Sequence, residues 1–262
     1  MTEKKKTNRA NIRQLICYIV LLIFGTIATI IVSQLVVGKL MILVLGADTF
    51  SETVPTAVFS ALSYIVALLM LIWLPTAIKN ARRKNKNEKP VKTMGREELG
   101  LKDLPTWTDI GLAPAGFIVY LVFAAALVAL FSTIPGFDPE QAQEVGFDTH
   151  LAGVDRMIAF LVLVVIAPIA EEIIFRGWLY TKLKNRLSKE TTRSVSIALT
   201  AFLVSLAFGI VHLQWNVGIN VFAMSIVACA LRELTGTIYA GILLHMLKNG
   251  IAFYMLFIAG IM

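Results

Sequence analysis

Cysteine and charge are both scarce in this chain, and each scarcity removes a class of protein. Only two cysteines occur among 262 residues. Both, Cys17 and Cys229, stand inside apolar segments, so neither a disulfide framework nor a CxxC metal pair is available. Charged residues make up 16% of the chain and hydrophobic residues 57%, and mean hydropathy is +0.76. A soluble domain usually carries about a quarter charged residues, so this composition indicates a membrane protein.

Several motifs of soluble enzymes are also absent. The sequence has no Gly-x-Ser-x-Gly nucleophile elbow, no His-Glu-x-x-His zinc motif and no phosphate-binding glycine loop. The net charge of +7 does not indicate nucleic acid, because the basic residues stand between the apolar runs, where cytoplasmic loops are expected. The first apolar run is too long for a cleaved signal peptide, so we expect a retained anchor.

Apolar runs of roughly 18 residues or more recur along the chain, long enough to cross a bilayer as helices. They predict an all-α, polytopic transmembrane helix bundle of about seven spans. The predicted spans are Leu15–Val37 (or on to Leu45), Val54–Ile78, Ile110–Ile134, Met157–Arg186, Val195–His212, Val217–Leu231 and Thr237–Met262. The sixth is the shortest. No internal repeat is visible, which disfavours a transporter built from inverted repeats.

Lysine and arginine are distributed unevenly between the loops. The linker Lys79–Leu104 holds nine basic residues, and the turn after the fourth span is basic too, whereas the Asp138–Asp155 connection is acidic. This asymmetry predicts a cytoplasmic N-terminus and an exterior C-terminus. We expect one integral membrane domain in two parts. Residues 1–153 would form anchor helices with a basic cytoplasmic loop at 79–104, and residues 154–262 a catalytic helix core.

Ionisable residues inside apolar helices are the first candidates for function, since each is costly unless it is paired or hydrated. Glu171 and Glu172 interrupt the fourth span. Glu172 and Arg176 are four residues apart, on one helix face, and can form an ion pair. Glu171 is rotated by about 100° from Glu172 and has no intrahelical cation at that spacing, which leaves it free for chemistry. A structural network that only locks the helix is the alternative.

Two of the three histidines stand in predicted spans. His212 ends the fifth span, and the midpoint between Glu172 and His212 falls in a polar turn, so a helical hairpin would bring the two residues to similar depth. His245 and Asn249 are four residues apart and share a helix face. A glutamate and a histidine can activate water, and a second histidine with an asparagine can donate hydrogen bonds to an oxyanion. Peptide hydrolysis needs these two functions.

Three short motifs follow one another on successive predicted helices: Glu171-Glu172-x-x-x-Arg176, Phe208-x-x-x-His212 and His245-x-x-x-Asn249. In this order they resemble the motifs of the CPBP family, the CAAX protease and bacteriocin-processing (Abi) proteins. The resemblance covers roughly residues 154–258, and the first three spans share only a generic likeness. One such motif alone is a moderate signal, whereas three ordered motifs at intramembrane positions are a strong one.

The family resemblance implies a role for each motif residue. Glu171 would be the catalytic glutamate, and His212 would help it to activate water. Glu172 would pair with Arg176 in support.

The third motif, by the same resemblance, would supply the oxyanion hole through His245 and Asn249. Lys248 lies inside this motif, where a charge must snorkel, pair with a carboxylate or face an aqueous cavity. We expect no cofactor and no metal ion.

The leading functional hypothesis is an intramembrane endopeptidase of glutamic type, acting on membrane-associated protein or peptide substrates. A zinc-dependent intramembrane metalloprotease stays open, because a glutamate and two histidines could ligate zinc. A non-catalytic bacteriocin-immunity or scaffold protein is the third hypothesis, and the complete set of costly polar residues argues against it. Short loops and a basic N-terminus favour a multi-pass protein of a bacterial plasma membrane. Its partners would be the lipid bilayer and the substrate, and not nucleic acid.

Overall fold

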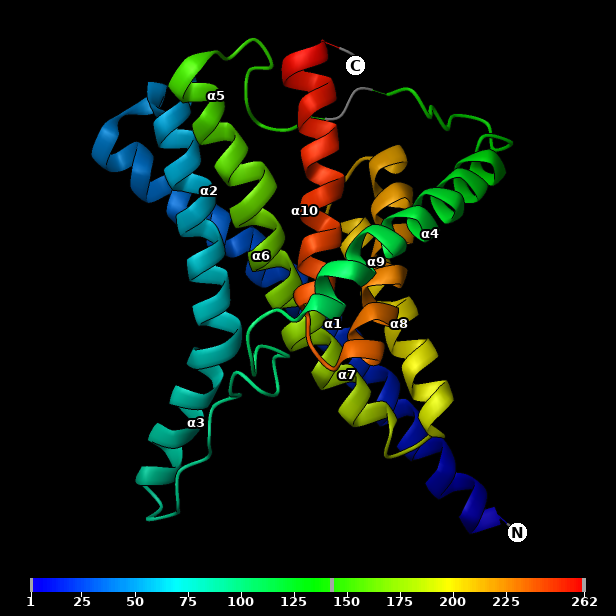
Figure 1. Cartoon of the computed structure of the whole chain (residues 1–262). Helices are drawn as coiled ribbons and strands as arrows, with labels where there is room; N and C mark the ends of the chain where they lie inside the picture. Colours follow the sequence, from blue (N-terminus) through cyan, green and yellow to red (C-terminus); the bar gives the residue numbers. More distant parts are fainter. Residues whose placement is uncertain (1, 142–143, 261–262) are drawn as a thin grey trace.

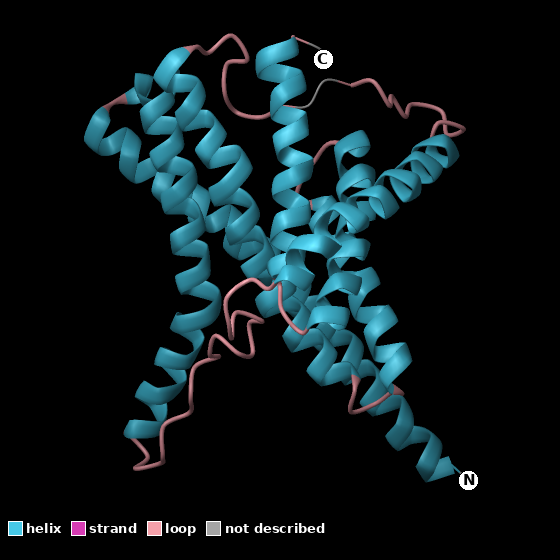
Figure 2. Ribbon diagram, viewed as in Figure 1, coloured by secondary structure: helices cyan, strands magenta, loops and turns pink. Residues whose placement is uncertain are grey.

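The computed structural model describes residues 2–141 and 144–260, and all regular elements in these two segments are helices (Figure 1, Figure 2). Seven helices in this described part of the chain are long and apolar enough to cross a membrane. The predicted all-α polytopic bundle is therefore confirmed, and the chain is an integral, multi-pass membrane protein. The start of the first helix and the end of the last lie at opposite ends of the molecule (Figure 1).

The first three membrane-length helices form the N-terminal half. The first is α1 Thr2–Leu45, which the short 3-10 turn η1 Ala47–Ser51 follows. The second is one continuous helix made of α2 Thr53–Leu68, η2 Leu69–Trp73 and α3 Leu74–Lys84. The third is α4 Trp107–Phe131. The apolar part of α1, Ile12–Leu45, has 34 residues, which at about 1.5 Å per residue exceeds a hydrocarbon core of about 30 Å. Accordingly α1 runs obliquely behind the other helices (Figure 1).

The fourth membrane-length helix, Gly153–Leu187, is continuous but not uniformly α-helical. Its elements are α5 Gly153–Phe160, the π-helical segment η3 Leu161–Ile166, α6 Ala167–Glu172, the π-helical segment η4 Ile173–Leu179 and α7 Tyr180–Leu187. Three more helices follow: α8 Arg193–Ile210, α9 Trp215–Thr235, and α10 Tyr239–Tyr254 with its π-helical end η5 Met255–Ala259.

Some predicted boundaries are wrong. The fifth span ends at Ile210 and not at His212, because Leu213 adopts a left-handed backbone with φ 57° and the chain turns over residues 211–214. The sixth span is Trp215–Thr235, six residues longer than the predicted Val217–Leu231, since its polar residues face other helices and a cavity. The last helix ends at Ala259, and the predicted end at Met262 lies outside the described residues.

The helices of the C-terminal half pack around α9, which contacts α4, α8 and α10. A glycine pair lets α8 and α9 approach closely: a Cβ added to Gly209 would lie 2.8 Å from the carbonyl oxygen of Gly218. The helix α2 packs along α5 and α6, while α1 covers α2 and touches α8. Large apolar side chains over α1, α2 and α4 remain exposed, as expected of a lipid-facing surface.

The linker between α3 and α4 folds back against the ends of α7, α9 and α10. The carbonyl oxygen of Gly100 accepts a hydrogen bond from the Ile238 backbone N–H at 3.0 Å, and Arg232 donates to the Glu98 carbonyl at 3.2 Å. A capping box of Thr106 and Asp109 then starts α4. The linker thereby fixes where the following helix enters the bundle.

Candidate active site

Glu172 and Arg176 form the buried base of the candidate site. The Arg176 Nη1 atom lies 3.1 Å from Glu172 Oε1, and both side chains are 0% exposed. The guanidinium also lies over the Phe208 ring, with its Cζ 4.4 Å from the ring centroid. A Cβ at Gly241 would lie 3.1 Å from Glu172 Oε2, so the glycine gives the carboxylate room beside α10. The ion pair predicted from the i,i+4 spacing is present.

His245 connects the two neighbouring glutamates. Its Nδ1 lies 3.2 Å from Glu172 Oε1, and its Nε2 lies 3.8 Å from Glu171 Oε2. A carboxylate accepts hydrogen bonds, so the Nδ1–H donates to Glu172. The Nε2 atom then lies on the side of Glu171. The histidine is almost fully buried, at 3% side-chain exposure, whereas Glu171 keeps 17%.

Tyr64 of α2 holds the other oxygen of Glu171. Its hydroxyl donates to Glu171 Oε1 at 2.5 Å, a short hydrogen bond of the kind that a charged acceptor favours. The sequence analysis did not identify this residue, because it lies 107 positions before Glu171 in a helix without a motif. A tyrosine in an apolar run was the only available signal. Glu171 is thus held by one oxygen, with the second facing His245.

Phe208 joins the two histidines. Its ring makes edge-to-face contacts with His212 at 4.9 Å and with His245 at 5.7 Å between centroids. The His212 Nδ1 lies 2.8 Å from the Phe208 carbonyl oxygen, so that nitrogen donates and Nε2 is left as an acceptor. His212 lies in the turn after α8 and forms no ion pair within 4.0 Å with a carboxylate of the described residues.

Asn249 makes a helix-to-helix contact that its predicted role did not include. Its Nδ2 donates to the carbonyl oxygen of Leu163 at 2.9 Å. In this π-helical segment Ala167 donates to Val162, five residues earlier. The next residue, Pro168, has no N–H to donate to Leu163. Asn249 therefore satisfies the carbonyl that the proline leaves unpaired, and it keeps one amide hydrogen for another acceptor.

The structure thus brings most of the predicted site residues together. Glu171, Glu172, Arg176 and His245 form one connected cluster. His212 reaches the cluster through Phe208, whereas the side chain of Asn249 is directed to Leu163. Across the described residues, no group of three or more histidine, cysteine, aspartate or glutamate side chains has the geometry to hold a metal ion.

The comparison with protein families places these residues in a known context. Residues 153–251 match the family described as type II CAAX prenyl endopeptidase, Rce1-like. The matched segment begins at the first residue of α5 and includes all three motifs. No curated protein and no solved structure matches the chain.

The family match confirms the resemblance that the three motifs indicate, over the segment that it covers. Together with the seven membrane-length helices of the described residues, it identifies the class of protein. The chain is a multi-pass membrane protein with an Rce1-like region, and this class supports the activity of an intramembrane endopeptidase.

Proposed function

We propose that the protein is an intramembrane endopeptidase of glutamic type, with Glu171 as the general base. The proposal rests on the observation that the two oxygens of this carboxylate have different contacts. Oε1 is held by Tyr64 at 2.5 Å, and Oε2 is left 3.8 Å from the Nε2 atom of His245. The next residue, Glu172, is fully buried and bound to Arg176, so it is not accessible to a substrate.

The geometry suits the activation of a water molecule. Two atoms 3.8 Å apart can both lie at hydrogen-bond distance from one water oxygen. Glu171 takes a proton from this water while the water oxygen bonds to the scissile carbonyl carbon. The protonated Glu171 then gives that proton to the amide nitrogen as the carbon–nitrogen bond breaks. This last step restores the carboxylate.

The other predicted site residues complete the proposal. His212 presents its Nε2 as an acceptor and would orient the water or the substrate amide. Asn249, through its free amide hydrogen, and His245 would together form the oxyanion hole of the tetrahedral intermediate. Tyr64 positions the base, and Phe208 holds both imidazole rings in place.

The substrates that we propose are membrane-associated proteins or peptides. The name of the matched family refers to prenylated CAAX proteins, which are substrates of those relatives. For this chain the short loops and the basic N-terminus favour a bacterial plasma membrane. Signal-like peptides, small pro-peptides and membrane-protein tails are then the expected substrates.

A cleavage assay with two neighbouring variants tests the proposal. The full-length protein, purified into lipid nanodiscs, is incubated with a peptide library derived from bacterial membrane proteins, and new termini are identified by mass spectrometry. Glu171→Gln should abolish cleavage and leave thermal stability unchanged, because it removes only the base. Glu172→Gln should lower stability, since an unpaired buried partner costs about 3–5 kcal/mol. Cleavage by Glu171→Gln with none by a folded Glu172→Gln would reverse the two roles.

Chelation separates the glutamic mechanism from a zinc-dependent one. With Glu171 as the base, cleavage should persist in EDTA and in phenanthroline. Loss of cleavage that stoichiometric zinc restores would instead support the metalloprotease hypothesis.

A further inference from the structure

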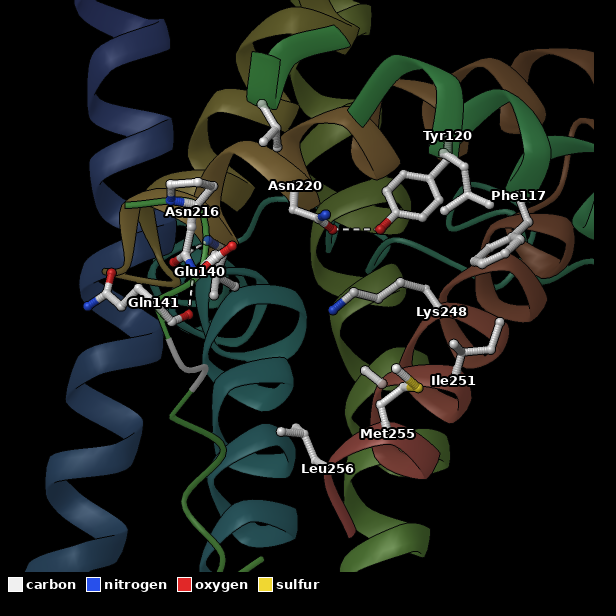
Figure 3. A pocket seen from close by; sticks show the side chains of 15 residues that line it. Phe117, Tyr120, Glu140, Gln141, Asn216, Asn220, Lys248, Ile251, Met255 and Leu256 are labelled. Carbon is white, nitrogen blue, oxygen red and sulfur yellow. Dashed lines mark hydrogen bonds between the residues drawn. The ribbon is translucent and has the colours of Figure 1, made fainter. Parts of the chain in front are cut away.

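A cavity of about 750 Å³ is lined by Lys248, which follows His245 of the candidate active site by three residues (Figure 3). It is lined by α4, α9, α10 and the segment at residues 139–141. Its volume is within the range of ligand-binding pockets, roughly 300–1,000 Å³. Much of its wall is apolar, with Phe117, Ile251, Met255 and Leu256 as large contributors. The cavity can therefore receive apolar groups of a peptide.

Lys248 introduces a positive charge into this apolar wall. Its side chain extends from α10, and its amino group is directed into the cavity (Figure 3). No carboxylate among the described residues lies within 4.0 Å of it. The carboxylate of Glu140 belongs to the opposite wall, and Glu171 acts on Lys248 only by longer-range attraction. A half-buried ammonium group in a membrane helix with no carboxylate within 4.0 Å is costly, which favours an anionic partner that arrives with a ligand.

The position of Lys248 relates the cavity to the reacting groups. It follows His245 by three residues, so the two side chains share one face of α10 and are separated by about 4.5 Å along the helix axis. A ligand group bound at Lys248 is therefore only a short peptide length from Glu171 and His245. The cavity is suited to one flank of the scissile bond.

Asn220 of α9 provides a second donor to the same cavity. The Tyr120 hydroxyl donates to Asn220 Oδ1 at 2.6 Å (Figure 3). This bond uses the carbonyl end of the amide and leaves its NH₂ group as a donor in the same cavity that Lys248 lines. One ammonium group and one amide NH₂ together match the acceptor-only chemistry of a carboxylate.

We propose that this cavity is a substrate subsite that binds a peptide carboxylate through Lys248 and Asn220, with apolar residues next to it. The proposal rests on the proposed function and specifies the substrate class: peptides that carry a carboxylate on one side of the cleavage site. Either an acidic side chain or a free C-terminus supplies this group. Glu140, on the opposite wall, keeps the carboxylate at the α10 side.

A binding experiment tests the subsite without requiring cleavage. The probes are three fluorescein-labelled peptides with the core Leu-Ala-Phe-Ala-Leu, one ending in Asp with an amidated terminus, one in Asn with an amidated terminus, and one in Asn with a free carboxylate. Each is titrated into full-length Glu171→Gln protein in nanodiscs and followed by fluorescence anisotropy. At least one carboxylate peptide should bind about tenfold more tightly than the neutral peptide, as one charge-assisted contact predicts. The stronger of the two identifies the source of the carboxylate.

Substitutions of Lys248 then test whether this residue causes the preference for carboxylate peptides. In the Glu171→Gln background, Lys248→Met should remove the difference between the peptides, and Lys248→Arg should keep it. Lys39→Met, which removes an exposed lysine of α1, is the matched control and should have no effect. Equal binding of all three peptides, or an unchanged preference in Lys248→Met, would overturn the subsite. Failure of the wild type to cleave any library peptide would count against the proposed function and not against this binding result.

Discussion

Glu171 and Glu172 are adjacent in the sequence, yet the helix places them in different surroundings. The side chain of Glu172 is 0% exposed and shared between Arg176 and His245, whereas Glu171 is 17% exposed. A rotation of about 100° along the helix is enough to separate a structural carboxylate from an accessible one. His245 contacts both, so it couples the position of the accessible carboxylate to the buried ion pair.

Tyr64→Phe tests how far the hydroxyl from α2 positions Glu171. The substitution removes the 2.5 Å hydrogen bond and keeps the ring, so the fold should persist. We expect the catalytic rate to fall by about tenfold or more, because a base that is free to rotate loses its alignment with the water. The value of KM should change little. Steady-state kinetics on a peptide cleaved by the wild type measures both quantities.

Tyr18→Phe serves as the control for this loss of a hydroxyl, since Tyr18 lies on α1 and the charged group acting on it is Arg186, not a residue of the site. A Tyr64→Phe protein with wild-type kcat would show that the hydrogen bond does not position the base. A raised KM with an unchanged kcat would indicate a role in substrate binding.

The helix Gly153–Leu187 departs from regular α-helical geometry in two segments, and specific residues accompany this departure. Two π-helical segments flank α6, which carries the glutamates. Pro168 stands between them and leaves the Leu163 carbonyl without its backbone donor, and Asn249 of α10 fills that place. π-helical segments of this kind occur frequently at functional sites. The same asparagine therefore joins two helices and lies one turn from His245.

A double substitution separates the two roles of Asn249. Asn249→Ala leaves the Leu163 carbonyl unsatisfied, which should cost about 1–3 kcal/mol of stability. If Asn249 is also an oxyanion donor, its removal should lower kcat by about 10²–10³-fold with little effect on substrate binding. Adding Pro168→Ala supplies a backbone N–H directed at the same carbonyl. The double variant should regain thermal stability and remain slow.

The contrary result is also informative. If Pro168→Ala restored both stability and turnover to the Asn249→Ala protein, the asparagine would be a purely structural link and its assignment to the oxyanion hole would be wrong. Pro168→Ala alone is the control for effects of the proline itself. Thermal unfolding and steady-state kinetics on the four proteins complete the comparison.

The parts of the fold that follow from local pattern were predictable, and the parts that depend on distant contacts were not. The seven helices follow from apolar length, and the Glu172–Arg176 pair follows from i,i+4 spacing. The extent of α9 was underestimated at both ends, because Asn216 faces a cavity and Arg232 donates hydrogen bonds to Gly177 and Thr181, so neither residue faces lipid. The bond from Tyr64 to Glu171 joins two helices far apart in the sequence, and no periodicity encodes it. The hydrogen bond from Asn249 to Leu163 could not be predicted either, because it depends on the π-helical hydrogen-bond pattern around Leu163.

In the whole molecule, the basic and the acidic loops lie at opposite ends of the helix bundle. The basic linker after α3 and the turn before α8 lie at one end, and the acidic connection between α4 and α5 lies at the other (Figure 1). We expect the basic end to be cytoplasmic. The cavity includes residues 139–141 in its wall, so it would be reached from the exterior side.

Reporter fusions test this orientation. Alkaline phosphatase fused after residue 88 should be inactive, since it would stay in the cytoplasm, and fused after residue 144 it should be active. Green fluorescent protein at the same two positions should give the opposite pattern. Exterior activity at residue 88 would reverse the orientation and with it the side from which the cavity opens.

Because Tyr64 and Glu171 are joined by a hydrogen bond but lie on opposite sides of the linker in the sequence, we predict that the chain can be divided into two complementing pieces. The linker turns at Asn87, where φ is 53°, and a chain interrupted there keeps Tyr64 on one fragment and the three motifs on the other. Co-expressed in one membrane, residues 1–87 and 88–262 should reassemble along the packed surface of α2, α5 and α6 and recover cleavage. Residues 88–262 alone, which contain the whole family match, should be impaired at least as much as the Tyr64→Phe protein. Cleavage would then measure, inside a living cell, whether the two helical fragments have associated in the bilayer.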